Sequence, residues 1–480
     1  GTPRAGTLAQ PLPRQIRAPA RAWRGGIRMK AMKAVIRSLT PSPKKKRGSQ
    51  SSDSELVGSE GTPKYDLLIY GASGFTGRLC AEYVAARYAD KVARFTWAVA
   101  GRSSSKLEEV IDGLACKNLP EIVLADSKDF ASVHAMCKST FVVLNCAGPF
   151  ERFGTPVVEA CAAIGTNYCD INGELHWVKE MEGRYGSIAA KTGALIIPMC
   201  GFDSVPSDIG TFMVVLHMAE AMQQECASVK AFHHDMRGMV SGGTMSTMMG
   251  ICNRPVRELA ALAPTITDLY ALNPAGGWRG GDTELWSESH IPWFDLDMMM
   301  LTAPLVLTIV NSRVVRRSAG VLSYGANFRY SEVYAAEWHP LDLAMGLAFW
   351  LMPLVVMAAG FIPPLRWFLN RFVLPAPGQG PSRQVRENGR FKLTLVGRTA
   401  GPPAGKEGGA AMVVGTIEGK QDPGYGETAK MSVECAMAIV VQKHQLPGRD
   451  GGFHTPATGI GRALIERLRA AGMTLRVDEA

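Results

Sequence analysis

The stretch Tyr-Asp-Leu-Leu-Ile-Tyr-Gly-Ala-Ser-Gly-Phe-Thr-Gly-Arg, residues 65–78, decides the fold of this chain. It contains the apolar run Leu67–Tyr70, which is too short for a helix and is typical of a buried parallel strand. Glycines follow at positions 71, 74 and 77, and residues 79–88 then have helical apolar spacing. We expect a strand, a glycine-rich turn and a helix. In that arrangement free backbone N–H groups and the positive end of the helix bind a pyrophosphate.

The three glycines would have separate roles in such a turn. Gly71 would permit the tight turn, Gly74 the close approach of a phosphate, and Gly77 the packing of the helix on the strand. Because the spacing is G-x-x-G-x-x-G rather than G-x-G-x-x-G, a glycine-rich turn without a ligand remains an alternative. The residues expected to line a dinucleotide site here are Gly71, Ser73, Gly74, Phe75, Thr76 and Gly77.

The second apolar run, residues 95–100, indicates which dinucleotide binds. No acidic residue occurs in the seven positions that follow it. Folds that bind NAD usually carry Asp or Glu at this point, whereas folds that bind NADP carry Arg or small polar residues. We therefore predict NADP(H) as the cofactor, bound near Gly101, with its 2′-phosphate held by Arg102, Ser103 and Lys106. A solvated arginine at a strand end is the alternative interpretation of Arg102.

Basic residues are concentrated at the N-terminus. The 480-residue chain has a formal net charge of +9, but residues 1–52 hold thirteen Lys or Arg and no Asp or Glu. The remainder has 39 basic and 43 acidic residues, a net charge of −4. This balance argues against nucleic-acid binding by the folded part of the chain.

Residues 1–63 are expected to be a basic disordered tail or an organelle transit peptide, mitochondrial or chloroplast. Met29 or Met32 could be the natural start, and Pro43–Arg47 could be a nuclear signal or a solvated charge run. The ten cysteines of the chain form no C-x-x-C pair and no cluster with His. That distribution predicts a reducing compartment and no metal site.

Apolar runs alternate with helical spacings up to about residue 200. Strands are expected at residues 121–125, 141–146, 166–170 and 194–199, with helices at 128–138, 155–164 and 175–191. The alternation predicts an α/β fold with a Rossmann-type doubly wound parallel sheet over residues 64–204 and ligands at the C-terminal strand ends. Unusual residues at those ends extend the expected cofactor site to Asp126, Asn145, Cys146, Gly148 and Pro149.

The pattern changes after residue 205. Strands are expected at 229–233 and 327–333, a hairpin from 391–398 and 412–417, helices over 426–442 and 456–470, and a last strand at 474–477. These elements predict a second α+β domain over residues 205–480 that binds substrate and whose sheet faces the nucleotide. No element is assigned within residues 234–325, which are rich in aromatic residues, Met and Gly.

One segment of the second domain is strongly apolar. Leu343–Ile362 contains twenty residues without a charged side chain, enough to cross a bilayer. Pro353 and Pro363-Pro364 interrupt it, and a true span would separate the C-terminal elements from the domain that they complete. We therefore predict that residues 342–374 form a hydrophobic membrane-seating insertion, a broken hairpin in one leaflet or on a lipid droplet. A buried core helix or a lid is the alternative.

These motifs together resemble the saccharopine dehydrogenase-like oxidoreductases and the related trans-acting enoyl reductases of bacterial lipid assembly. The matching segments are residues 71–77, 98–102, 143–150, 168–174, 201–208 and 453–456. The resemblance implies an NADP-binding domain, an α+β second domain and association with membranes or lipid droplets. It does not imply lysine metabolism, because no Arg cluster for an amino-dicarboxylate is recognisable.

Hydride transfer requires a well-placed acceptor and a group that stabilises the charge developing on it. For an enoyl thioester the enolate oxygen could be stabilised by the N–H groups of Gly173 and Gly201, or by the hydroxyls of Ser204 and Thr244. The catalytic candidates, including the possible proton donors, are Tyr168, Asp170, Glu174, Asp203 and Ser204. Structural roles are equally open: Asp203 and Asp208 could cap a helix, and Asp170 could connect two loops.

Three functions agree with the sequence. The first is an NADPH-dependent oxidoreductase that reduces C=C or C=O of a lipid-linked or acyl substrate at a membrane or lipid-droplet surface. The second is a non-catalytic nucleotide-binding protein of the same surfaces, since no unambiguous acid–base pair is visible. The third, a soluble imine or amino-acid dehydrogenase, is disfavoured by the apolar segment. A homodimer is compatible with each.

Overall fold

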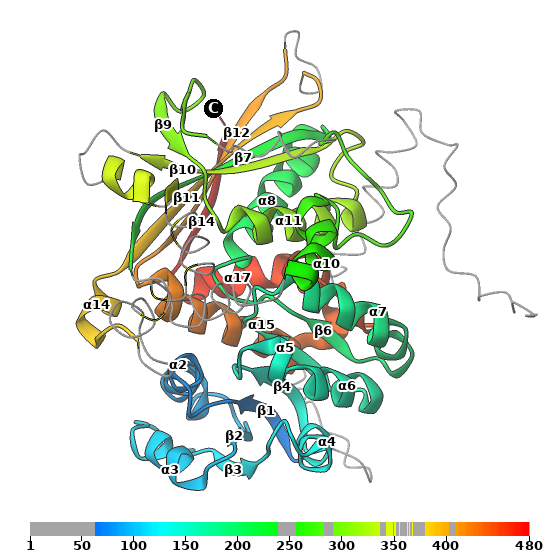
Figure 1. Ribbon diagram of the computed structural model, residues 1–480, viewed down its shortest axis with the longest axis vertical. Helices are drawn as coiled ribbons and strands as arrows, with labels where there is room; N and C mark the ends of the chain where they lie inside the picture. Colours follow the sequence, from blue (N-terminus) through cyan, green and yellow to red (C-terminus); the bar gives the residue numbers. More distant parts are fainter. Residues whose placement is uncertain are drawn as a thin grey trace, which may run out of the picture.

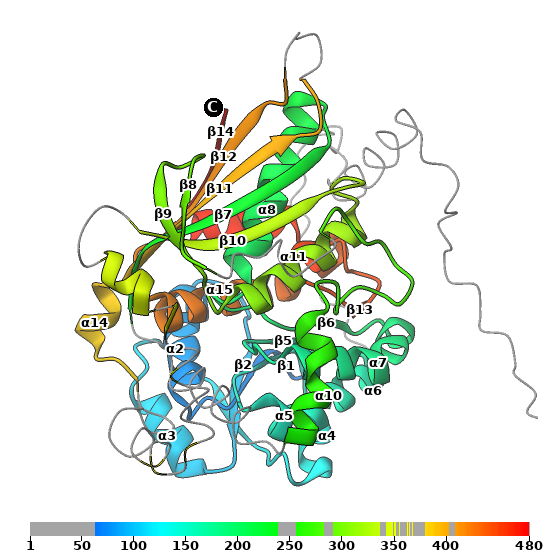
Figure 2. The ribbon, with the colours of Figure 1, turned by 45° about the horizontal axis from the view of Figure 1, so that its top comes forward.

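The computed structural model describes residues 63–238, 256–282, 291–336, 342–348, 380–402 and 409–479, with six single positions between 350 and 367. The predicted N-terminal tail, Thr244 and most of the apolar insertion lie outside these residues. Figures 1 and 2 show two sheets, one above the other, with helices α11, α15 and α17 between them.

The lower sheet is the predicted parallel one. Its seven strands have the order β13-β6-β5-β4-β1-β2-β3, and every neighbouring pair is parallel. The strands are β1 (Tyr65–Tyr70), β2 (Trp97–Gly101), β3 (Glu121–Leu124), β4 (Thr140–Asn145), β5 (Asn167–Asp170), β6 (Leu195–Ile197) and β13 (Gly452–Phe453). The order of the first six strands is that of the doubly wound dinucleotide-binding fold, which confirms the predicted Rossmann-type parallel sheet.

Helices cover both faces of this sheet, which is why its central strands are apolar on both sides. They are α2 (Phe75–Val84) with its π-helical continuation η1 (Ala85–Ala89), α3 (Ser104–Asp112), α4 (Phe130–Lys138), α5 (Phe150–Phe153), α6 (Thr155–Ile164) and α7 (Leu175–Thr192). Two of these helices, α6 and α7, end at glycines with positive φ, Gly165 at 93° and Gly193 at 78°.

The upper sheet is mixed and also has seven strands, in the order β14-β12-β11-β7-β10-β9-β8. They are β7 (Cys226–Arg237), β8 (Trp293–Asp295), β9 (Met300–Ala303), β10 (Arg329–Ala336), β11 (Arg390–Thr399), β12 (Met412–Gly419) and β14 (Thr474–Glu479). Only β7 and β10 are parallel neighbours; β11 and β12 pair antiparallel, as the predicted hairpin requires.

Residues 234–325, where no element was predicted, contain the end of β7, α10 (Val256–Thr267), β8, β9 and α11 (Thr308–Leu322). Helix α11 is hidden from pattern analysis because its buried face carries arginines. Arg316 is fully buried and pairs with Asp282, with 3.0 Å between Nε and Oδ2. Arg317 pairs with Glu182 of α7. Internal ion pairs therefore replace the apolar periodicity that would mark a core helix.

The remaining helices connect the sheets. They are α8 (Val205–His217) with η2 (Met218–Met222), α14 (Arg383–Glu387), η5 (Pro423–Glu427), α15 (Thr428–Gln442), η6 (Lys443–Gln445), α16 (Pro456–Gly459) and α17 (Arg462–Ala470). The helix predicted over residues 456–470 is two helices, because Gly461 adopts φ +62° between them. Helix α15 packs on β1, β4 and β5, and β13 joins the lower sheet. The first domain is therefore not one continuous stretch of sequence.

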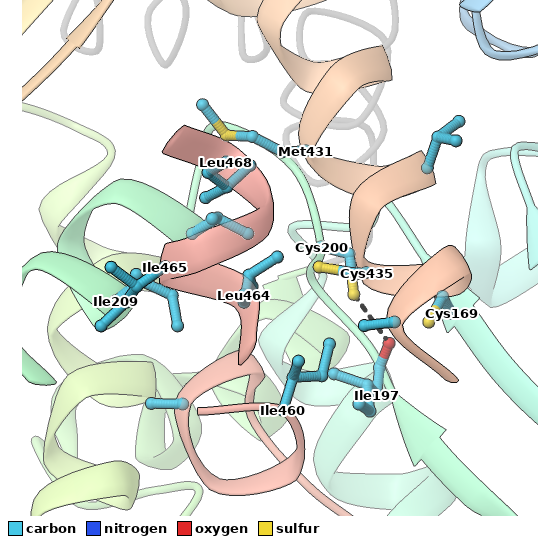
Figure 3. Packing of buried hydrophobic residues seen from close by; sticks show 14 of the residues in the cluster. Cys169, Ile197, Cys200, Ile209, Met431, Cys435, Ile460, Leu464, Ile465 and Leu468 are labelled. Carbon is cyan, nitrogen blue, oxygen red and sulfur yellow. Dashed lines mark hydrogen bonds between the residues drawn. The ribbon is translucent and has the colours of Figure 1, made fainter. Parts of the chain in front are cut away.

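A shared hydrophobic core holds the two sheets together (Figure 3). Cys169 and Cys200, at the ends of β5 and β6, lie beside Cys435 of α15, and Leu464 and Leu468 of α17 complete the cluster. All five side chains are buried. The relative position of the sheets is therefore fixed by apolar packing between them.

The part of the apolar insertion that is described begins with a helix at residues 342–348. Leu343 and Met345 pack against Tyr334 and Leu305, at the upper sheet. Within the part of the chain that the structure describes, no helix combines the length and apolar character that crossing a membrane requires.

Candidate cofactor and active site

The C-terminal ends of four parallel strands lie in one row. Ala100 of β2 pairs with Tyr70 of β1, Tyr70 with Asn145 of β4, and Asn145 with Asp170 of β5. The loops that follow these residues therefore begin at the same edge of the sheet. The predicted cofactor segments after residues 70, 100 and 145 meet there, as the sequence analysis expected.

The three glycines of the turn after β1 differ in the contacts that a side chain would make. A Cβ at Gly71, which has φ +79°, would lie 2.8 Å from the backbone N of Ala147. A Cβ at Gly77 would lie 2.3 Å from the carbonyl oxygen of Gly71. At Gly74 the nearest such contact is 3.2 Å, again to the oxygen of Gly71. Gly71 and Gly77 are thus required by the fold, whereas a Cβ at Gly74 would meet one atom within 4 Å and would need only a small shift.

Gly74 is also the N-cap of α2, and no side chain caps that helix end. The first N–H groups of a helix have no partner within the helix and attract an anion. The open backbone at Gly74 and the uncapped end of the ten-residue α2 therefore fit the pyrophosphate of a dinucleotide. Thr76 is half-buried in the first turn, and Phe75 packs edge-on against Tyr425 of η5, 4.7 Å between centroids.

At the end of β2 the predicted 2′-phosphate residues lie at the surface. Gly101 is buried, and a Cβ there would lie 3.7 Å from Oγ of Ser73, so the first turn and the second strand end are adjacent. Arg102 and Lys106 are exposed. Ser103 has a structural role, since its Oγ accepts a hydrogen bond from the backbone N–H of Lys106 and caps α3.

Arg102→Ala is expected to weaken NADPH binding by ~1.5–3 kcal/mol, the range of one hydrogen bond to a charged group. NADH, which lacks the 2′-phosphate, should bind equally well to both proteins. Fluorescence titration of both reduced nucleotides measures the difference, and Lys91→Ala, an exposed cation before β2, is the control. Equal loss of affinity for both nucleotides would contradict the role of Arg102.

The loop after β4 is shaped by its own side chains. Asn145 donates from Nδ2 to the Tyr168 hydroxyl at 3.1 Å and accepts at Oδ1 from the N–H of Ala147 at 2.9 Å. The peptide bond between Gly148 and Pro149 is cis. The two hydrogen bonds of Asn145 use both ends of its amide, so this side chain positions the loop beside Gly71.

Two other predicted cofactor residues have local partners. The thiol of Cys146 lies 3.8 Å from that of Cys80 on α2. Asp126, which follows β3 and Ala125, accepts at Oδ1 from the N–H of Lys128 and shapes the turn into α4. Both residues remain half-buried at the strand ends.

Tyr168 and Asp170 are fully buried and joined to each other. The Tyr168 hydroxyl donates to Oδ2 of Asp170 at 2.8 Å, and Oδ1 accepts from the N–H groups of Met199 and Asn172. Burial raises the pKa of Asp170 to about 7, although these two backbone N–H groups oppose the shift. The geometry is that of the structural alternative, in which Asp170 connects the loops after β5 and β6.

Glu174 has both carboxylate oxygens occupied. It accepts from the N–H of Phe150 at 3.0 Å and from the N–H of Glu151 at 2.8 Å, and it is buried. These are the first N–H groups of α5, so Glu174 caps that short helix and fixes the loop after β4.

The candidates in the segment after β6, Asp203, Ser204 and Asp208, have different surroundings. The Ser204 hydroxyl donates to the backbone oxygen of Asp203 at 2.7 Å. Asp208 does not cap α8 as one interpretation expected, because it accepts from Ser318 of α11 and from the N–H of Ala457, and burial raises its pKa to about 7. Asp203 does not cap α8 either, since Ser204 is the N-cap without a side-chain bond. Asp203 is the half-buried carboxyl of the group.

The segment of Asp203 lies beside a pair of residues that the sequence analysis did not select. Phe202 packs edge-on against His233 of β7, and His233 hydrogen-bonds to Glu332 of β10. Burial and the charge of Glu332 raise the pKa of Asp203 to about 6, and His233 opposes the shift. In the sequence, Glu332 stands out as a lone carboxylate within the apolar run of β10, and His233 as a histidine at the end of a predicted strand. Ninety-nine residues separate the pair, so only the sheet register brings them together.

A parallel sheet with an uncapped glycine turn and an arginine at the second strand end is typical of Rossmann-type domains that bind a dinucleotide. The family model described as the saccharopine dehydrogenase NADP-binding domain matches residues 67–197, and the domain binds NADP(H). The chain belongs to the saccharopine dehydrogenase-like family that includes the trans-acting enoyl reductases.

Two relatives illustrate that similarity. A Mycobacterium tuberculosis protein whose name assigns it provisionally as a trans-acting enoyl reductase is 33% identical over 434 residues, covering 86% of this chain and 98% of the relative. The trans-acting enoyl reductase of Mycobacterium bovis is 32% identical over 431 residues, covering 86% and 97%. Among solved structures, saccharopine dehydrogenase (L-Glu forming) from Saccharomyces cerevisiae has a TM-score of 0.49 at 12% identity, covering 87% of this chain and 100% of that one.

Proposed function

We propose that this protein is an NADPH-dependent reductase that reduces the C=C bond of an acyl or lipid-linked substrate at a membrane or lipid-droplet surface. The observation that carries the proposal is the extent of the similarity to trans-acting enoyl reductases, which covers 86% of this chain. The aligned region is much longer than residues 67–197, which the model of the nucleotide-binding domain matches. The similarity therefore extends well into the substrate domain.

Bound NADPH supplies a hydride to the acyl chain. For an enoyl thioester the hydride acceptor is the β-carbon, negative charge moves to the thioester oxygen, and the α-carbon then takes a proton. This chain has to hold the thioester oxygen near hydrogen-bond donors and deliver that proton. The backbone N–H groups of Gly173 and Gly201 and the half-buried carboxyl of Asp203 are the groups that we assign to these tasks.

The non-catalytic alternative has one specific observation in its favour. Tyr168, Asp170 and Glu174 all have structural partners, which leaves few groups for acid–base chemistry. A protein that only bound nucleotide would need no free acid or base among these three residues. A measurement of catalytic turnover distinguishes the two functions.

The lipid surface is supported by apolar side chains that are exposed on neighbouring elements. In the hairpin of β8 and β9, Trp293 is 68%, Leu296 77% and Met299 61% exposed. Helical residues 342–348, which begin the apolar insertion, contact β9 and β10, and Leu347 is 52% exposed. Exposed apolar side chains gathered on adjacent elements are typical of a surface that contacts lipid or another protein.

The proposed function is tested by NADPH oxidation in detergent against trans-2-enoyl thioesters of several chain lengths. We expect oxidation that depends on the enoyl double bond, and none with the saturated thioesters. A second set, 3-ketoacyl thioesters, separates C=C from C=O reduction. Tight NADPH binding without oxidation in either set would favour the non-catalytic function.

A further inference from the structure

A short segment that precedes β11 of the upper sheet lies against the glycine turn of the lower sheet. A Cβ at Gly380 would lie 2.4 Å from two ring atoms of Phe75, Cε1 and Cζ. Phe75 is the first residue of α2, directly after the N-cap Gly74. Helix α14, which follows Gly380, contacts η5, and η5 contacts α2. Figures 1 and 2 show α14 beside α2. The helix that begins at the glycine turn therefore has neighbours outside the parallel sheet.

One arginine of this segment lies at the glycine turn. The Arg386 guanidinium lies over the Phe75 ring, with 5.3 Å between its Cζ and the ring centroid. The backbone of Arg386 is held on both sides. Its N–H donates to the carbonyl oxygen of Ser382 at 3.0 Å, and its own carbonyl oxygen accepts from the N–H of Asp422 at 2.8 Å. Contacts with α14 and η5 thus fix the place from which the side chain reaches Phe75.

Arg386 makes no ion pair within the part of the chain that the structure describes. Its Nη1 donates to the carbonyl oxygen of Pro381 at 2.9 Å, and this is one hydrogen bond for a side chain with five N–H donors. The side chain is half-buried. Arg383 of the same helix, in contrast, pairs with Glu387, with 2.7 Å between Nε and Oε1. Arg386 is therefore a partly desolvated cation with donors left for an anion.

The electrostatics of α2 favour the same kind of ligand. The N-terminal end of a helix carries a partial positive charge, and its first N–H groups have no partner within the helix. No side chain caps this end of α2. A second positive charge beside it is unfavourable until an anion compensates both. A guanidinium can donate two parallel hydrogen bonds to phosphate oxygens, so Arg386 has the chemistry that a pyrophosphate at this helix end requires.

We propose that Arg386 binds the pyrophosphate of NADP(H), together with the free N–H groups at the start of α2. Arg386 lies far outside residues 67–197, which the model of the NADP-binding domain matches. The inference concerns the cofactor and does not depend on which substrate is reduced. Two arginines then recognise different phosphates. Arg102 contacts the 2′-phosphate, which only NADP(H) carries, whereas Arg386 contacts the pyrophosphate, which NAD(H) carries as well.

The test compares Arg386→Met with the control Arg383→Met. Methionine keeps an unbranched apolar side chain against Phe75 and removes the charge and the donors. Arg386→Met should weaken the binding of NADPH and of NADH by the same factor, about 10- to 100-fold, as expected for lost hydrogen bonds to a charged group. Arg383→Met should leave both affinities nearly unchanged, because that arginine is exposed and already paired. Fluorescence titration measures both nucleotides.

A fragment of the cofactor gives a second readout. Adenosine 2′-monophosphate carries the 2′-phosphate but no pyrophosphate. It should bind to Arg386→Met as tightly as to the wild type, and more weakly to Arg102→Ala. Because the two arginines contact different phosphates, their effects on NADPH should add in the double variant. Arg386→Lys, which keeps the charge without the planar fork, should recover part of the lost affinity for both dinucleotides.

The melting temperature without nucleotide separates binding from packing. We expect Arg386→Met to melt close to the wild type. A lower melting temperature together with weaker binding of all three ligands would show that Arg386 only supports the turn, and would overturn the proposal. Unchanged NADH affinity, or a loss confined to NADPH, would also overturn it. Failure to reduce any acyl thioester, with this pattern of affinities intact, would overturn the proposed function alone.

Discussion

Gly74→Val is expected to abolish NADPH binding while the protein stays folded. The backbone at Gly74 has φ −75° and ψ 166°, which valine adopts readily. A Cβ there meets only the Gly71 oxygen, at 3.2 Å, so the turn accommodates it with a small shift. The rest of the side chain then occupies the space over the end of α2 where the pyrophosphate would bind.

Gly77→Ala is the matched comparison. Its Cβ would lie 2.3 Å from the Gly71 oxygen and 2.8 Å from Cα of Ala72, both backbone atoms. The turn would have to move, so this variant should lose thermal stability as well as NADPH affinity. Melting temperature and fluorescence titration separate the two effects. Normal NADPH affinity in Gly74→Val would show that the phosphates bind elsewhere.

Deletion of Leu343–Arg371, with the ends joined by a short Gly/Ser linker, should abolish flotation with liposomes or lipid droplets. The deleted segment carries twenty consecutive residues without charge, the largest apolar stretch of the chain. The lower sheet and the glycine turn are distant in sequence, so NADPH affinity should be retained. Co-flotation in a density gradient measures the first effect and fluorescence titration the second.

A double substitution outside the insertion serves as the control for this deletion. Trp293→Ser with Leu296→Ser changes two exposed side chains on the β8–β9 hairpin and leaves the insertion intact. It should weaken flotation without abolishing it, since each side chain adds only part of the apolar contact. If the intact chain floats no better than the deletion variant, the insertion does not bind lipid.

The parallel sheet could be predicted because its strands are apolar on both faces and end in glycines or polar residues. The hairpin of β11 and β12 could be predicted from its alternation. Helix α11 could not, because buried Arg316 and Arg317 look like surface residues until Asp282 and Glu182 are seen beside them. Ion pairs between distant segments leave no local pattern.

The cofactor half of the site was accessible to sequence reasoning, since a dinucleotide is bound by backbone and by short contiguous turns. The catalytic half was not. Tyr168, Asp170 and Glu174 are chemically suitable residues next to strand ends, yet all three have structural partners. These partners are backbone N–H groups, one another and the amides of Asn145 and Asn172. His233 and Glu332 come together only through the parallel register of β7 and β10.

The central claim is that this family member uses NADPH to reduce a carbon–carbon double bond. NADPH carrying deuterium at both C4 positions, incubated with the protein and a trans-2-enoyl thioester, tests it most directly. Mass spectrometry and NMR of the product should find one deuterium, on the β-carbon, and none when Gly74→Val replaces the wild type. Deuterium on the carbonyl carbon, or a reduced product without deuterium, would contradict the account.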